Sequence, residues 1–100
     1  MADTYAQYHF FVENTGDGAW QEHVFADQAP SALNFMSQGV IIANDDGADD
    51  LEISFRDDGA GTPVLGGIVK ISEILTFDGK REFKVKVRHP VGKKSRIFAW

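Results

Sequence analysis

Residues 51–56 and 82–88 alternate between apolar and polar side chains without a fault, and this period of two is the strongest constraint on the fold. Successive side chains of a β-strand point to opposite faces, so such alternation is typical of strands with one buried face. It predicts that Phe83, Val85 and Val87 point inward. A third series of the same kind lies near the start of the chain and consists of Tyr8, Phe10 and Val12.

Shorter strands are predicted at residues 74–77 and 96–100, and the apolar run 39–43 predicts a central strand covered on both sides. Clusters of Gly, Asp and Asn separate these runs, as tight turns require; they lie at residues 14–18, 44–47, 57–61, 78–80 and 89–93. One hundred residues fit one domain. We therefore expect a single all-β domain over residues 1–100, a β-sandwich or small jelly roll of about seven to eight strands.

The stretch 29–37 is ambiguous. Apolar residues recur there at helical spacing and Gly39 is placed to end a helix, yet residues 33–35 also alternate. We expect at most one short helical segment in this stretch.

The sequence contains no cysteine, which excludes disulfides and thiolate metal sites and favours folding in a reducing cytoplasm. The first five residues have neither the basic nor the apolar region of a signal peptide, so none is expected. The longest apolar run, residues 40–43, is far shorter than the roughly 20 residues of a membrane-spanning helix. We expect no membrane partner.

No catalytic or metal-binding pattern is present in the sequence. His9, His23 and His89 lie on three separate segments without ligand spacing, so each is expected at the surface or rim. Asp57 and Asp58 are adjacent at a strand end, where neighbouring side chains point to opposite faces. We expect no catalytic residue, no cofactor and no metal, and therefore no enzyme.

The acidic stretch 45–50, followed by Glu52, is dense in the oxygen ligands that calcium prefers. It lacks the alternating spacing and the distal Glu of a helix–loop–helix calcium site. A solvated hairpin explains it equally well, and calcium binding stays an alternative.

Charge is distributed unevenly along the chain, whose net charge is −5. Residues 1–60 carry twelve acidic residues and one basic residue, whereas residues 61–100 carry nine basic and three acidic ones. Lys84, Lys86 and Arg88 share one face of a predicted strand, and we expect them to form an interface with an acidic protein surface. The alternatives are a solvated sheet face, or nucleic acid, which the overall acidity disfavours; we expect no nucleic-acid partner. Opposed charges favour head-to-tail self-association, unless folding interleaves the two halves.

Residues 40–45 (VIIAND), 51–55 (LEISF) and 71–78 (ISEILTFD), closed by 97–100 (IFAW), follow a pattern of strands and turns. Over residues 39–100 this pattern resembles the small β-sandwich structural proteins of tailed bacteriophage virions, which decorate capsids or sit in necks and tails. The glycine of that family's turn is absent at Ile71-Ser72-Glu73, and no functional residue carries over. The resemblance implies a structural role in a repeated assembly, located in the virion and assembled in the host cytoplasm.

These features favour a non-enzymatic virion structural or assembly protein that forms a homo-oligomer or docks on another protein of a phage capsid, neck or tail. The alternative is a carbohydrate-binding or host-recognition β-sandwich module, for which Tyr5, Trp20 and Trp100 are the candidate stacking residues. A small jelly-roll enzyme is disfavoured because the histidine cluster of such metal-dependent enzymes is missing.

Overall fold

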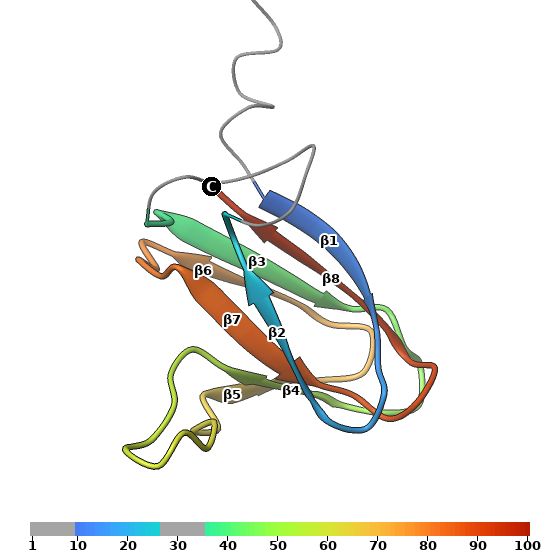
Figure 1. Ribbon diagram of the computed structural model, residues 1–100. Coiled ribbons are helices and arrows are strands. Elements are labelled where there is room, and N and C mark those ends of the chain that lie inside the picture. The colour runs from blue at the N-terminus through green and yellow to red at the C-terminus, as the bar shows by residue number, and fades with distance from the viewer. Residues whose placement is uncertain (1–9, 27–35) are drawn as a thin grey trace, which may run out of the picture.

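The computed structural model describes residues 10–26 and 36–100, which form eight β-strands (Figure 1). Over these two ranges there is no helix, and hence none long and apolar enough to cross a membrane. In chain order the strands are β1 (Phe10–Thr15), β2 (Trp20–Val24), β3 (Gly39–Asn44), β4 (Leu51–Ser54), β5 (Gly67–Val69), β6 (Ile74–Asp78), β7 (Lys84–Arg88) and β8 (Lys94–Ala99).

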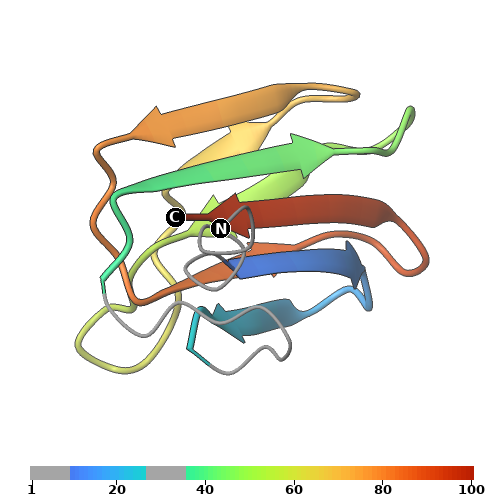
Figure 2. The same ribbon diagram turned by 90° about the horizontal axis from the view of Figure 1, so that it is seen from above.

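The strands form two antiparallel four-stranded sheets that pack face to face (Figure 2). Sheet A has the order β1-β8-β3-β6, and sheet B has the order β2-β7-β4-β5. Strands that follow one another in the chain lie in different sheets, except β4 and β5, which pair with each other in sheet B. This arrangement is that of an eight-stranded jelly roll and confirms the predicted all-β sandwich.

The two C-terminal strands lie inside their sheets. β7 pairs with β2 on one side and β4 on the other, and β8 pairs with β1 and β3. Each therefore has N-terminal strands as both of its neighbours. The topology places the basic part of the chain between acidic segments, which decides the electrostatics described below.

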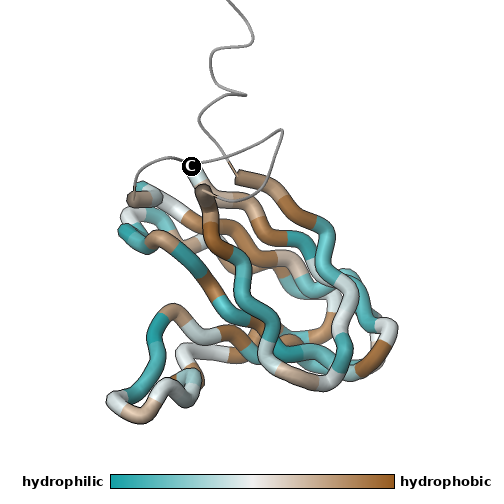
Figure 3. Tube along the Cα trace, viewed as in Figure 1, coloured by the Kyte–Doolittle hydropathy of each residue, from teal (hydrophilic) through white to brown (hydrophobic). Residues whose placement is uncertain are grey.

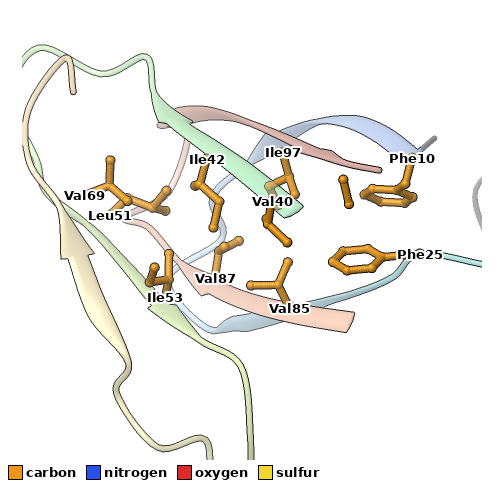
Figure 4. Packing of buried hydrophobic residues seen from close by; sticks show 11 residues of the cluster. Phe10, Phe25, Val40, Ile42, Leu51, Ile53, Val69, Val85, Val87 and Ile97 are labelled. Atoms are coloured by element: carbon orange, nitrogen blue, oxygen red, sulfur yellow. The ribbon is translucent and has the colours of Figure 1, made fainter. Parts of the chain in front are cut away.

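The core lies between the two sheets and consists of apolar side chains that point toward one another (Figure 4). Apolar and polar residues alternate along the strands, as the hydropathy colouring shows (Figure 3). Burial of each large aliphatic or aromatic member contributes about 1.5–3 kcal/mol. The members of the cluster are Phe10, Phe25, Val40, Ile42, Leu51, Ile53, Val69, Val85, Val87, Ile97 and Ala99.

The alternation predicted most orientations correctly, with one exception. Phe10, Val85 and Val87 are buried, and Val12 is partly buried against the core. The inward orientation predicted for Phe83 is wrong, because this residue is 59% exposed. The chain bends at Phe83 and β7 begins only at Lys84, so the alternation is interrupted before the strand starts. Tyr8 lies outside the described residues.

Two strands have no sequence prediction. β2 reads WQEHV, which does not alternate, and β5 is only three residues long. Both are edge strands, and each pairs with one inner strand of sheet B: β2 with β7, and β5 with β4. Most of the ambiguous stretch 29–37 lies outside the described residues; its last two positions, Met36 and Ser37, are not helical.

The run 39–43 forms a central strand of sheet A, as predicted, but its outer side is covered only in part. Val40 and Ile42 are buried in the core, whereas Ile41 on the opposite face is half-buried. At one end of this face, the ring of Trp100 lies directly on Gly39, where any side chain would collide with the indole. The backbone amide of Trp100 donates to the carbonyl of Gly39 at 3.1 Å, which extends the pairing of β8 with β3.

Candidate functional site

The predicted interface residues Lys84, Lys86 and Arg88 lie on β7 in the middle of the outer face of sheet B. Val85 and Val87 alternate with them and are buried in the core, so the three cations share the solvent side as predicted. What the sequence did not show is which side chains stand next to them across the sheet.

Each of the three cations is paired with a carboxylate. The ammonium of Lys84 lies 3.0 Å from Glu22 Oε2, and that of Lys86 lies 2.9 Å from Asp57 Oδ1. The guanidinium of Arg88 donates two hydrogen bonds to Glu52, from Nε at 2.7 Å and Nη2 at 3.0 Å. We call this set of three ion pairs the charge ladder.

Arg88 also lies over the ring of Trp20, 4.8 Å from its centroid, in the geometry of a cation–π contact. The register explains these neighbours, because Arg88 stands directly opposite Trp20 on β2 and Glu52 on β4. The hydrogen bonds from Arg88 lower the pKa of the Glu52 carboxyl, and those same bonds raise the pKa of Arg88. A hydrogen bond to Glu22 likewise raises the pKa of Lys84. The charge ladder is therefore electrically compensated within one molecule, and its role as an interface stays a prediction.

Two further cations, Lys93 in the turn before β8 and Arg96 on β8, follow the same rule, whereas Lys94 donates to the hydroxyl of Thr15. Lys93 lies 3.4 Å from Asp49 and 3.6 Å from Asp46, and Arg96 forms a bidentate pair with Asp45. In all of these pairs the cation comes from the last 40 residues and the acid from the first 60. Folding interleaves the two halves, which is the alternative that the sequence left open, because β7 and β8 are inserted between N-terminal strands.

The acidic stretch 45–50 is a structured turn. The Asp46 carboxylate accepts hydrogen bonds from the backbone amides of Ala48 and Asp49, and these bonds lower the pKa of Asp46. Across residues 10–26 and 36–100, no three His, Cys, Asp or Glu side chains are grouped so as to hold a metal ion. Asp46 thus stabilises the turn, and Asp45, Asp46 and Asp49 form the ion pairs with Arg96 and Lys93.

Asp57 and Asp58 are used separately. Asp57 binds Lys86, whereas Asp58 accepts hydrogen bonds from the amides of Ala60 and Thr62 and organises the loop between β4 and β5. Those amides lower the pKa of Asp58. The adjacent carboxylates do not converge on one point, as the alternation predicted.

The expectation of surface or rim histidines is wrong for His89, which is fully buried. It continues the inward series of Val85 and Val87, and this period of two was the signal in the sequence that could have placed it. Its Nε2 lies 3.3 Å from the carbonyl oxygen of Asp49. His23 is half-buried at the rim; its Nε2 lies 2.8 Å from Asn14 Oδ1, and burial lowers its pKa.

His9 lies outside the described residues.

The outer face of sheet A differs from that of sheet B because its centre is apolar. Phe11 on β1 and Ile41 on β3 both stand opposite Phe98 on β8, and Ile74 on β6 stands opposite Ala43 on β3. Ile74 is 59% exposed and Phe11 is 39% exposed. We call these five residues the apolar face.

The apolar face is slightly hollowed. The residues that line the hollow are Phe11, Ile41, Ala43, Ile74 and Phe98, with Arg96 at the side. The sequence did not reveal this surface, because Ile41 and Ala43 belong to a run predicted to be covered on both sides. An apolar surface that spans four strands is typical of a contact with another protein.

Comparisons with known proteins bear on the fold. No family model and no curated protein matches the chain. Three chains of solved structures match. One of them belongs to the Bacillus endospore appendages, described as a family of disulfide-linked pili; it is 14% identical with a TM-score of 0.57, and the match covers 91% of this chain and 79% of that one. At this level of identity the likeness shows a shared β-sandwich fold.

Proposed function

We propose that this chain is a non-enzymatic structural module that self-associates through the apolar face of sheet A. The observation that carries the proposal is the contrast between the two outer faces. In sheet B, each cation of the charge ladder is already paired with a carboxylate of the same molecule. In sheet A, Phe11, Ile41 and Ile74 lie on the solvent side. A second copy of this chain has the same apolar face, and burial of the two faces against each other would drive self-association.

The structural neighbour supports a role in assembly. That protein is described as forming pili that are linked by disulfides. The present sequence contains no cysteine, so a contact between copies of it cannot be a disulfide. An apolar face combined with internally compensated charges suits such a contact.

The finer proposal concerns the setting of this assembly. The pattern over residues 39–100 resembles small β-sandwich proteins of phage virions, and we propose a virion capsid, neck or tail as the place where the module acts. Its partners would be further copies of itself or another virion protein, with no nucleic acid and no membrane involved. Assembly would take place in the host cytoplasm.

Sedimentation velocity over a wide concentration range tests the proposal. We expect association to persist or strengthen between about 0.1 M and 1 M salt, where exposed charges are increasingly screened. Phe11→Ser should weaken association, whereas Leu65→Ser, which removes a more exposed apolar side chain from the loop between β4 and β5, should not. A protein that stays monomeric throughout, or equal effects of the two substitutions, would refute the proposal.

A second candidate function is carbohydrate binding. A shallow hollow at the end of sheet A combines the indole of Trp100 with polar groups that match sugar hydroxyls; it is lined by Gln38, Asp78, Gly79, Arg81 and Trp100. Titration of a glycan panel against intrinsic fluorescence tests it. Trp100→Leu should abolish any saccharide response, and a response that survives the substitution would exclude this hollow as the site.

A further inference from the structure

We infer that the exposed edge of β6 is the contact strand of the assembly and that it pairs, antiparallel, with β6 of a second copy about a twofold axis at Thr76. This inference rests on the proposed self-association and adds a second contact, the edge of β6, to the contact through the apolar face. It would join the two copies of sheet A into one continuous sheet.

The backbone of β6 has hydrogen-bonding groups directed away from the molecule. β6 pairs only with β3 and forms one edge of sheet A; Figure 2 shows no described strand beyond it. The amide of Asn44 donates to the carbonyl of Glu73, which identifies this as a hydrogen-bonded pair of the ladder. Such pairs alternate along an antiparallel ladder, so Leu75 and Phe77 form backbone hydrogen bonds to β3. The backbone amides and carbonyls of the residues between and beside them, Ile74, Thr76 and Asp78, point outward.

The bonds on the other side of β3 agree with this phase. The amide of Gly39 donates to the carbonyl of Trp100, and the carbonyl of Gly39 accepts a hydrogen bond from the amide of Trp100. Gly39 therefore bonds toward β8, and Val40 and Ile42 bond toward β6. The open backbone groups of β6 can be satisfied only by water or by another extended strand.

β6 lacks the features that usually protect an edge. Its sequence, ILTFD, contains no lysine, arginine, proline or glycine, and its single charge lies at the end. The other edge of sheet A is partly closed, because the side chain of Gln21 donates to the carbonyl of Thr15 on β1. In sheet B, edge strand β5 has three residues. β6, with five residues, is thus longer than β5, and within the described residues it lacks the side-chain bond that partly closes β1.

The side chains of β6 also indicate a missing neighbour. Leu75 and Phe77 point toward the core but are only partly buried, because they lie at the edge of the sheet. A strand added beside β6 would cover them. With Thr76 on the twofold axis, Leu75 of one copy stands opposite Phe77 of the other, which is an aromatic–aliphatic cross-strand pair.

The same symmetry places Thr76 opposite Thr76 and Ile74 opposite Asp78 of the second copy. The side chains of these three residues lie on the outer face, so both apolar faces end up on the same side of the joined sheet. Ile74 belongs to the apolar face and to the edge, which makes the two surfaces continuous. The predicted unit is a closed dimer with an isologous interface. The apolar faces of its two copies together form one larger apolar surface on one side of the joined sheet.

A cysteine scan tests this geometry in a chain that has no cysteine of its own. In a hydrogen-bonded antiparallel pair the two Cα atoms lie about 5.5 Å apart, within the range that a disulfide bridges. We expect Thr76→Cys to form a disulfide-linked dimer under mild oxidation, seen on a non-reducing gel. Glu13→Cys, at an equivalent outward position of edge strand β1, is the matched control and should stay unlinked. A mixed dimer between the two variants would overturn the inference in favour of β6 pairing with β1.

A second pair of variants tests the edge without a cross-link. Thr76→Lys places two like charges opposite each other on the axis and should raise the dissociation constant of the dimer by up to about fivefold, whereas Thr76→Gln should change it little. Sedimentation velocity measures the dissociation constant, and a thermal melt of each variant shows that it is folded. If the wild-type protein is monomeric, both the proposed function and this inference fail. If the wild type associates and Thr76→Lys associates equally well, only the assignment of β6 is refuted.

Discussion

Ile41 and Ile42 are adjacent on β3 but point to opposite faces of sheet A, and truncation of each to alanine separates the core from the outer face. Ile42 is fully buried between the sheets. Ile42→Ala removes three carbons, each worth about 0.8 kcal/mol of transfer free energy, and leaves a cavity in addition. We expect the free energy of unfolding to fall by about 2–5 kcal/mol.

Ile41→Ala is the matched control, since it removes the same atoms from the next residue of the same strand. Ile41 is half-buried and lines the hollow of the apolar face, so its truncation leaves no enclosed cavity. We expect a loss of about 1 kcal/mol in the free energy of unfolding. The effect of this substitution should appear in self-association, which the Ile42→Ala variant should retain as long as it is folded.

Urea unfolding followed by circular dichroism measures both changes. A domain of this size has about 5–15 kcal/mol of stability, and each kcal/mol lowers its melting temperature by about 4–8 °C. Ile42→Ala should therefore melt well below the wild type but still fold in buffer. Equal losses for the two variants would refute the assignment of Ile41 to the outer face, and with it the argument for the apolar face.

Three further predictions concern other parts of the molecule. Burial lowers the pKa of His23, so on acidification the unfolded chain takes up a proton near pH 6.5, before the folded protein does. The free energy of unfolding should therefore be highest above that pH and should fall as the pH drops toward the lowered pKa. His23→Gln should reduce this decline in a series of thermal melts at different pH. Gly39→Ala should destabilise the fold because the new Cβ meets the indole of Trp100, and Trp100→Ala should relieve that collision in the double variant, as differential scanning calorimetry would show. Lys86→Glu places a second carboxylate beside Asp57 and should lower the melting temperature, while addition of Asp57→Lys restores an ion pair; failure of this charge swap to recover stability would show that the pair contributes nothing.

The sequence predicted the structure best where a residue's orientation depends only on its neighbours in the chain. Alternation placed Val85 and Val87 in the core, and the turn clusters separated strands at the correct positions. The same rule extended by one step would have placed His89 inside. It failed at Phe83, because a bend before β7 changes the phase of the side chains and leaves no mark in the pattern.

The ion pairs of the candidate site depend on contacts between residues that are far apart in the chain. The sequence predicted that Lys84, Lys86 and Arg88 share a face, which is a local property of a strand. It could not show that Glu22, Asp57 and Glu52 stand beside them, because these partners lie 29 to 62 residues away in the chain. Only the insertion of β7 between β2 and β4 brings them together.

The sequence by itself determined the all-β class of this protein, the approximate number of strands and most of the core, because the period of two and the turn residues act over a few positions. The tertiary structure alone decided which strands are neighbours. That choice paired the basic face with acids on sheet B, gathered Phe11, Ile41 and Ile74 into one apolar surface on sheet A, and left β6 at an open edge. Strand order depends on long-range pairing and on the packing of two whole sheets, and no short segment of the chain contains that information.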